Sequence, residues 1–400
     1  MLNTNFSSWP KFSNEEAEKV KQVLLSNKVN YWTGQECREF EKEFANYFES
    51  KYAIALANGT VAIDLALKAL DIGDGDEVIV TSRTFLASVS SIINSGAKPI
   101  FADICPNSQN ILSSESLDLI NSNTKAILCV HLAGYPCEMD RIMNIAKDHN
   151  LNVIEDCAQA HGAKYKGKSV GSIGHIGCWS FCQDKIMTTG GEGGMVTTNN
   201  ESLWKKMWAY KDHGKSYDAV YNKKHPDGFK WLHDSFGTNW RMTEIQGCIG
   251  RIQLKKMPEW TKQRNFNQNM IWDKCRSLDG LRIPKFNEKS WEFYNSGNIH
   301  AAYKCYVFVE EEKLNSGWSR DKIINEIVSM GVPCYSGSCS EVYLEKAFQN
   351  KDFCPKARLK NAKKLGETSL MFLVHPTLES EEIKRTCEAI KSVMTRAACI

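Results

Sequence analysis

Short apolar segments alternate with helix-forming segments between residues 52 and 198. The predicted strands cover residues 52–57, 77–81, 99–103, 126–131, 152–155, 176–181 and 194–198. Helices are predicted between several of them, at residues 61–70, 87–94 and 140–149. Strands that alternate with helices predict right-handed crossovers and a mostly parallel sheet with both faces covered. The sequence therefore predicts an α/β fold for this part of the chain.

The flanking regions have a different pattern. Residues 13–30 and 36–49 are predicted helices, and the second carries Phe40, Phe44 and Phe48 on one face. Beyond residue 255 the predicted elements are a long polar helix at 258–277, a strand at 303–309 and helices at 319–330 and 380–395. We therefore expect two domains in the 400 residues: the N-terminal helices with a large α/β domain (1–255) and a smaller α+β domain (256–400).

Composition excludes several classes of protein. Hydrophobic residues make up 42% of the chain and charged residues 24%, which is typical of a globular protein with a sizeable core. The 50 basic and 47 acidic residues give a net charge of +3, which argues against a strongly basic nucleic-acid binder. No apolar run approaches the roughly 18 residues of a membrane span. We expect neither nucleic acid nor membrane as a partner.

The number of cysteines, 15, is the unusual feature of the composition. Their number is odd and no Cys-x-x-Cys occurs. The closest pairs, Cys178 with Cys182 and Cys334 with Cys339, have no second pair or paired histidines to complete a zinc site. We expect no metal, and we interpret most of these thiols as small buried side chains in a reducing compartment, the cytoplasm.

Two polar features follow predicted strands early in the block. Asn58-Gly59-Thr60 joins a strand to a helix N-terminus, where free backbone N–H groups and the Thr60 hydroxyl suit a phosphate; an ordinary turn and helix cap is the alternative. Thr84-Phe85 follows the strand at 77–81, and Phe85 either stacks on a flat heterocycle or packs in the core.

Two further features follow later strands. Asp156 ends the apolar strand at 152–155 and needs a cationic or donor partner, such as a protonated ring nitrogen, unless it is a helix cap. Lys185 follows the next strand and precedes four glycines, so it is either a Schiff-base nucleophile or a surface residue. Together, a phosphate cradle, an aromatic ring, a carboxylate and a lysine are what pyridoxal 5′-phosphate (PLP) requires.

At these motifs the sequence resembles the DegT/DnrJ/StrS family of PLP-dependent nucleotide-sugar aminotransferases, from about Trp32 to the end of the chain. The likeness is densest at 57–60, 155–162, 180–194 and 237–246. It implies a fold type I PLP-dependent transferase: a large domain with a mostly parallel seven-stranded sheet flanked by helices, and a smaller C-terminal α+β domain.

The resemblance also implies roles for individual residues. Lys185 would hold the cofactor covalently and shuttle the proton, and Asp156 would pair with the ring nitrogen. Gln159 would lie near the ring and Phe85 would stack on it. Gly59, Thr60 and Ser180 would hold the phosphate, and Asn239 would reach it from the neighbouring subunit, which implies a homodimer with shared active sites.

The implied activity converts a nucleotide-linked keto-deoxysugar to an amino sugar, with L-glutamate as amino donor, in the biosynthesis of surface polysaccharides such as O-antigen. His213, Arg241 and Tyr335 are candidates for the substrate side, although His213 is also readily interpreted as structural. The sequence departs from the family pattern by one extra glycine in residues 188–194, by Trp240 where tyrosine is commoner, and at 332–341, where the family often has His-Tyr-x-Pro-x-His.

Two alternatives stay open. A PLP-dependent sugar dehydratase of the same fold commonly has histidine in place of the lysine, and Lys185 argues against it. A non-catalytic regulatory relative would be expected to have lost Lys185 or Asp156, and both are present.

Overall fold

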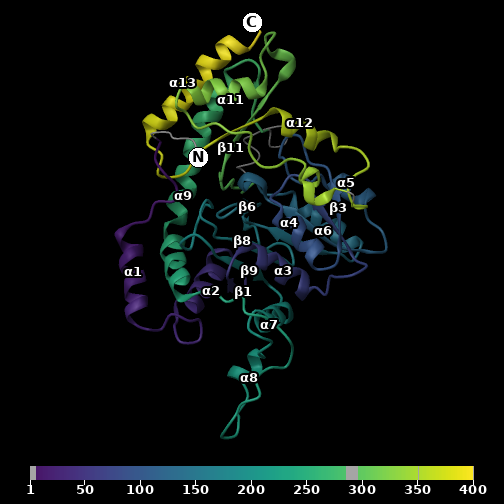
Figure 1. Ribbon diagram of the computed structural model, residues 1–400, viewed down its shortest axis with the longest axis vertical. Helices are drawn as coiled ribbons and strands as arrows, with labels where there is room; N and C mark the ends of the chain where they lie inside the picture. Colours follow the sequence, from purple (N-terminus) through teal and green to yellow (C-terminus); the bar gives the residue numbers. More distant parts are fainter. Residues whose placement is uncertain (1–5, 285–295, 350, 400) are drawn as a thin grey trace.

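The computed structural model describes residues 6–284, 296–349 and 351–399, and a seven-stranded sheet lies at its centre (Figure 1). Its order is β1-β9-β8-β5-β4-β2-β3. The strands are β1 (Tyr52–Leu56), β2 (Glu77–Thr81), β3 (Lys98–Ala102), β4 (Thr124–Val130), β5 (Asn152–Asp156), β8 (Ile176–Ser180) and β9 (Gly194–Thr198). Because only β9 runs antiparallel to its neighbours, the mostly parallel sheet is confirmed.

Helices cover both faces of this sheet. Because both faces are buried, the sequences of its strands are almost continuously apolar. The covering helices include α3 (Gly59–Ala69), α4 (Ala87–Asn94), α5 (Ser113–Asp118), α6 (Met139–Asp148) and α7 (Glu201–Tyr210). Alternate residues of β4 face opposite sides: Leu128 lies in the core formed with α3 and α4, and Ile127 packs in the core formed with α6. The two-residue period of the strand thus divides the apolar side chains between two cores.

Helices α1 (Asn14–Leu25) and α2 (Glu36–Tyr47) confirm the two helices predicted at the N-terminus, although α1 ends earlier than predicted. Asn27 adopts a positive φ of 59° just after α1, which ends the helix. Phe40 and Phe44 of α2, together with Phe48, are fully buried against β8 and the segment after it.

The long helix α9 (Glu244–Arg276) contradicts the predicted helix start at Pro258. The helix begins earlier because Thr243 and Gln246 form a reciprocal capping box at its N-terminus. Pro258 removes one backbone hydrogen bond inside the helix, but buried side chains on both sides of it maintain the helix. Residue 255 therefore lies within a continuous helix, and the division at 255/256 stays a prediction.

The C-terminal part forms a second core around a three-stranded antiparallel sheet, in the order β10-β11-β12. Its elements are β10 (Leu281–Arg282), β11 (Cys305–Val309), α11 (Arg320–Ser329), α12 (Lys360–Thr368), β12 (Ser369–Phe372) and α13 (Ser380–Ala397). In Figure 1, α9 runs along one side of the molecule from α2 to α13, and it contacts both.

A segment after α7 projects from the end of the molecule that lies farthest from α13 and the C-terminus (Figure 1). It contains α8 (Tyr217–Tyr221) and exposes Phe229, Trp231 and Phe236. A small hairpin of β6 (Lys164–Tyr165) and β7 (Lys168–Ser169) lies elsewhere, between β5 and β8 in the chain.

All 15 cysteines are free thiols, and ten of them are buried. This agrees with their interpretation as small apolar side chains. Among the described residues, no helix combines the length and the hydropathy that crossing a bilayer would require.

Candidate active site

Four strand ends meet at one pocket of about 580 Å³. The ends of β1, β2, β5 and β8 are brought together because strands that run in parallel end at the same edge of the sheet. Seven of the eight predicted cofactor residues line this pocket: Gly59, Thr60, Phe85, Asp156, Gln159, Ser180 and Lys185. Their individual roles stay predictions.

The first turn of α3 forms one end of the pocket. The Asn58 side chain caps the helix by accepting the Val61 N–H at 3.0 Å, and helix geometry leaves the first N–H groups of α3 without intrahelical partners. A Cβ on Gly59 would lie 2.5 Å from the Ser180 Cβ. Glycine is therefore required for α3 to approach β8, and this approach places Thr60 beside Ser180 in a cradle suited to an anion.

Asp156 ends β5 with its carboxylate buried in the pocket wall. One carboxylate oxygen accepts the Ser88 hydroxyl at 2.7 Å and the other accepts the Ala158 N–H at 3.0 Å. Burial raises the pKa of Asp156 above its usual value, although these hydrogen bonds and the charge of Lys185 oppose the rise. Within the described part of the chain, no cationic side chain hydrogen-bonds this carboxylate.

Lys185 lies on the wall contributed by the segment after β8. Its Nζ is 3.5 Å from Asp184 Oδ1 and 5.2 Å from the centre of the Tyr303 ring. The Tyr303 hydroxyl donates to the Asp184 carboxylate. Burial would raise the pKa of Asp184, but Lys185 and Tyr303 outweigh it and lower that pKa. Asp184 is therefore charged at neutral pH and balances the Lys185 ammonium.

Trp9 fixes the backbone of Lys185. Its Nε1–H donates to the Lys185 carbonyl at 2.7 Å, and its ring packs edge-on against Trp260 at 5.0 Å. Trp9 is not among the predicted site residues, because a single tryptophan near the N-terminus carries no periodic signal. The structure places it 176 positions away in the chain from the residue that it supports.

Gln159 and Phe85 also line the pocket. The Gln159 carboxamide oxygen accepts the Ala133 N–H at 2.8 Å, which fixes the side chain at the wall. Phe85 follows β2 and is 71% exposed. An exposed aromatic ring on a pocket wall is available to stack on a flat ligand, whereas the alternative of a core phenylalanine is excluded by this exposure.

The remaining predicted site residues lie away from this pocket. Asn239 pairs with Asp212 in an isolated bridge, and Arg241 forms an ion pair with Asp212 at 2.5 Å. His213 is exposed beside them, and Tyr335 is half-exposed next to β12. Within a single subunit none of these four residues lines the pocket, and their functional roles stay predictions.

The extra glycine in residues 188–194 is absorbed by the loop before β9. Gly190 and Gly191 adopt positive φ angles of 91° and 120°, and Gly191 pairs with Cys182 in an isolated bridge. Strand β9 keeps its register with both β1 and β8. The departure therefore leaves the register of the sheet undisturbed.

Comparison with known proteins identifies the family. The sequence pattern of the DegT/DnrJ/EryC1/StrS aminotransferase family matches residues 10–391. The chain belongs to this family. A GDP-perosamine synthase of Escherichia coli O157:H7 is 34% identical over 385 residues, which cover 95% of this chain and 96% of that protein.

Two further proteins are similar over nearly the whole chain. A dTDP-3-amino-3,6-dideoxy-alpha-D-galactopyranose transaminase of Aneurinibacillus thermoaerophilus is 40% identical over 380 residues, 95% of each protein. The X-ray structure of an aminotransferase from Psychrobacter cryohalolentis is 62% identical, covers 98% of this chain and 99% of its own, and superposes with a TM-score of 0.94.

As a member of this family, the protein is a sugar aminotransferase of fold type I, and its cofactor is pyridoxal phosphate. The residues present fit that group. Among the described residues no cationic side chain hydrogen-bonds the buried Asp156 carboxylate, and a protonated ring nitrogen would supply that partner. The α3 turn suits the phosphate, and Lys185 provides the amine. When bound, PLP supplies the electron sink that lets an amino group pass between substrates.

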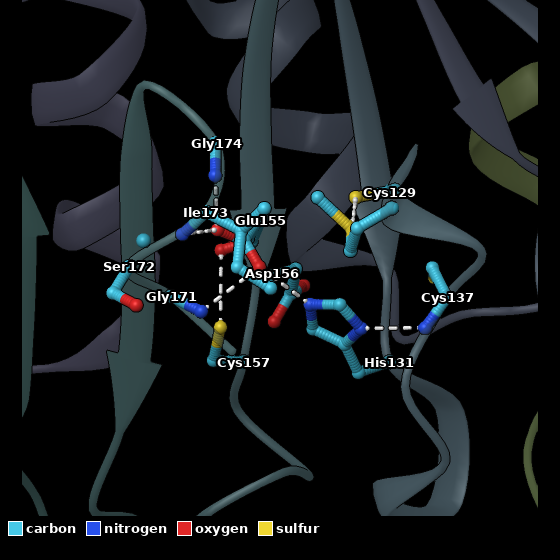
Figure 2. A network of polar contacts seen from close by, with 12 residues as sticks. Cys129, His131, Cys137, Glu155, Asp156, Cys157, Gly171, Ser172, Ile173 and Gly174 are labelled. Atoms are coloured by element: carbon cyan, nitrogen blue, oxygen red, sulfur yellow. Dashed lines mark hydrogen bonds and ion pairs between the residues drawn. The ribbon is translucent and has the colours of Figure 1, made fainter. Parts of the chain in front are cut away.

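A second polar cluster lies on the other side of β5 (Figure 2). Possible ligand atoms of His131, Glu155 and Cys157 lie within 4.8 Å of one another, as in a metal site. However, the Glu155 carboxylate already accepts three backbone N–H groups, those of Gly171, Ile173 and Gly174, at 2.6–3.0 Å.

The histidine of this cluster is also satisfied (Figure 2). His131 Nδ1 accepts the Cys137 N–H at 2.9 Å, so Nε2 carries the proton that points to Glu155 at 3.0 Å. The cluster therefore anchors β5 and the loop at 171–174, with Asp156 facing the pocket from the next position.

Replacing Glu155 with glutamine is expected to lower the free energy of unfolding by roughly 2–4 kcal/mol. The carboxamide keeps one acceptor oxygen and places an NH₂ group against backbone donors, so buried N–H groups lose their partners. Urea denaturation measures the change. The control Glu138→Gln removes an exposed carboxylate paired with Arg141 and should cost about 0.5 kcal/mol or less. Equal costs for the two variants would contradict the anchoring role.

Proposed function

We propose that this enzyme transfers the amino group of L-glutamate to a nucleotide-linked keto-deoxysugar, which yields an amino sugar and 2-oxoglutarate. The observation that carries the proposal is Lys185 and Asp156 on the walls of one pocket, at the ends of β8 and β5. Relatives named as GDP-perosamine synthase and as a dTDP-amino-sugar transaminase support a nucleotide sugar as the acceptor. A relative in Bacillus subtilis named as a spore coat polysaccharide biosynthesis protein supports a place in polysaccharide biosynthesis.

The two alternatives differ in the residues that they require. A sugar dehydratase of this fold would not need a lysine at position 185, and Lys185 is present on the pocket wall. A regulatory relative without catalysis would not need a buried, unpaired carboxylate at position 156, because burial of such a group costs free energy.

The decisive experiment loads the purified protein with PLP and incubates it with L-glutamate and a panel of GDP- and dTDP-linked keto-6-deoxysugars. We expect a visible absorption band, release of 2-oxoglutarate, and an amino-sugar product identified by mass and NMR. A product that has lost a hydroxyl group without gaining nitrogen would instead indicate a dehydratase. Transfer only between free amino and keto acids would contradict the sugar assignment.

The functional unit is proposed to be a homodimer in the cytoplasm. Support comes from the projecting segment, where Phe229, Trp231 and Phe236 are 76%, 84% and 97% exposed, as expected of a surface that a second copy covers. His213 precedes this segment in the chain and Asn239 and Arg241 follow it. The three lie close together, so a partner could bring them to the pocket as one group. Light scattering should give twice the 45.3 kDa chain mass, and cell fractionation tests the cytoplasm.

Tyr335 is proposed to contact the sugar nucleotide from the C-terminal core. Support comes from its position beside β12, where it is half-exposed and pairs with Met371 in an isolated bridge. Replacing Tyr335 with phenylalanine tests this role through the KM for the nucleotide sugar.

A further inference from the structure

Tyr303 lies behind the wall that Asp184 and Lys185 contribute to the pocket. Its ring is approached by two ammonium groups: Lys185 Nζ is 5.2 Å from the ring centre and Lys304 Nζ is 4.8 Å from it. The Tyr303 hydroxyl donates to Asp184. The ammonium groups of Lys304 and of Lys185, the lysine proposed to react, thus both contact the Tyr303 ring.

Lys304 has no counter-ion of its own. In the part of the chain that the structure describes, its ammonium makes no hydrogen bond or ion pair, and the Tyr303 ring is its one polar contact. The side chain is mostly buried but retains some exposure. Burial lowers the pKa of Lys304 to about 8; the Arg264 and Lys185 charges act in the same direction and Asp184 opposes them.

A second uncompensated cation lies deeper. Arg264 is 1% exposed, its Nε and Nη2 atoms have no partner among the described residues, and its guanidinium stacks on Trp9 at 4.9 Å. Burial lowers the pKa of Arg264 to about 9, and it remains charged at neutral pH. Among the described residues, the three cations Lys185, Lys304 and Arg264 therefore lie in this region near two carboxylates: Asp156 acts on Lys185, and Asp184 acts on both lysines.

The neighbouring histidines do not change this balance. His161 and His375 are buried, which lowers the pKa of each to about 3, so both are neutral at physiological pH. Uncompensated buried positive charge is costly unless an anion completes it. No carboxylate among the described residues forms an ion pair with Lys304, so an anion bound on the side where Asp184 and Lys185 face the pocket would compensate its charge.

We propose that Lys304 binds an oxyanion, a carboxylate or a phosphate, of a reactant held against Lys185, and that the buried Arg264 strengthens the positive field there. The inference rests on the proposed function only in its choice of reactants. L-glutamate carries carboxylates and a nucleotide sugar carries a diphosphate, so both offer the required chemistry.

The test compares wild-type holoenzyme with Lys304→Met, which removes the charge and keeps a similar length. Calorimetry measures the binding of L-glutamate, 2-oxoglutarate, GDP and dTDP, and thermal unfolding measures Tm. We expect Lys304→Met to weaken one class of probe by about tenfold or more and to leave Tm unchanged or higher, because an unpaired buried charge is removed. Loss confined to the two dicarboxylates identifies a carboxylate site, and loss confined to the nucleotides identifies a phosphate site.

Two further substitutions of Lys304 and one control substitution elsewhere complete the design. Lys304→Arg keeps the cation and should bind within about threefold of wild type, and Lys304→Gln repeats the charge removal with a polar side chain. Lys147→Met removes an exposed lysine on α6 and should change nothing. Binding of all four probes within twofold of wild type by both uncharged variants, or a uniform loss accompanied by a lower Tm, overturns the proposal. Wild-type binding of the probes without amino transfer to any nucleotide sugar would overturn the proposed function alone.

Discussion

Replacing Lys185 with alanine is expected to abolish the visible absorption band of the PLP-loaded protein and to lower kcat for amino transfer by at least about 10³-fold. Among the described residues that line the pocket, Lys185 is the one lysine, so no neighbouring amine can take its place. A spectrum and a steady-state assay of the same preparation measure both effects.

This loss should not reflect unfolding. The Lys185 ammonium is 3.5 Å from Asp184, whose side chain is 57% exposed, and pairs of that kind contribute about 0–1 kcal/mol. Lys185→Ala should therefore keep a Tm close to that of wild type.

Lys185→Arg is the matched variant, because its guanidinium keeps the positive charge but stays protonated and cannot act as a nucleophile. We expect it to be as inactive as Lys185→Ala. Activity restored by arginine would indicate a purely electrostatic role, and a visible band retained in Lys185→Ala would contradict covalent attachment at this residue.

Much of the large sheet could be predicted because its signals are local. Strands 77–81 and 194–198 and helix 87–94 agree with the structure to the residue, since each is a short apolar or helix-forming run bounded by turn residues. The pocket followed from one further step: polar residues after parallel strands gather at one edge. That step brought together Asp156 and Lys185, which are 29 positions apart, without any knowledge of their contacts.

The unpredicted features depend on contacts distant in the chain. Trp9 supports Lys185 from the far N-terminus, and Tyr303 reaches Asp184 from the start of the second core. No local pattern marks either residue. Strand β12 is only four residues long and forms because β11 offers it an edge, so it too was missed.

The start of α9 was missed for a different reason. Proline is favoured at the first position of a helix, and the predicted helix begins at Pro258. The Thr243–Gln246 capping box, 15 positions earlier, is also a local signal and was available in the sequence. Proline inside a helix is tolerated here because tertiary burial along α9 outweighs the lost hydrogen bond.

Replacing Asp156 with asparagine is expected to lower kcat by about 10²–10³-fold and to weaken retention of PLP. Asparagine can keep the hydrogen bond from the Ala158 N–H and the contact with Ser88, so the shape of the wall is preserved. Only the negative charge is lost, and with it the stabilisation of a protonated ring nitrogen. Dialysis followed by absorbance measures retention, and the glutamate-dependent assay measures kcat.

The same substitution should alter how the stability of the cofactor-free protein depends on pH. Burial raises the pKa of Asp156 in the folded state, against the opposing hydrogen bonds of Ser88 and Ala158. A raised pKa means that the folded chain holds this proton more tightly than the unfolded chain, whose aspartate has a pKa of about 3.9. The contribution of Asp156 to stability is therefore fully present below about pH 4 and is lost as pH rises through the folded pKa.

Urea denaturation of cofactor-free wild type and Asp156→Asn from about pH 4 to pH 7 measures this difference, with the exposed Asp140→Asn as a control within about 0.5 kcal/mol of wild type. Wild type should lose stability relative to Asp156→Asn as pH rises. Loading with PLP should reverse the order, because a cationic ring nitrogen then compensates the buried carboxylate. If wild type is the more stable protein at pH 7 without PLP, Asp156 is a structural cap and not a carboxylate kept unpaired for its ligand. A reversal that depends on PLP would show that the free energy lost by burying Asp156 is recovered when the cofactor binds.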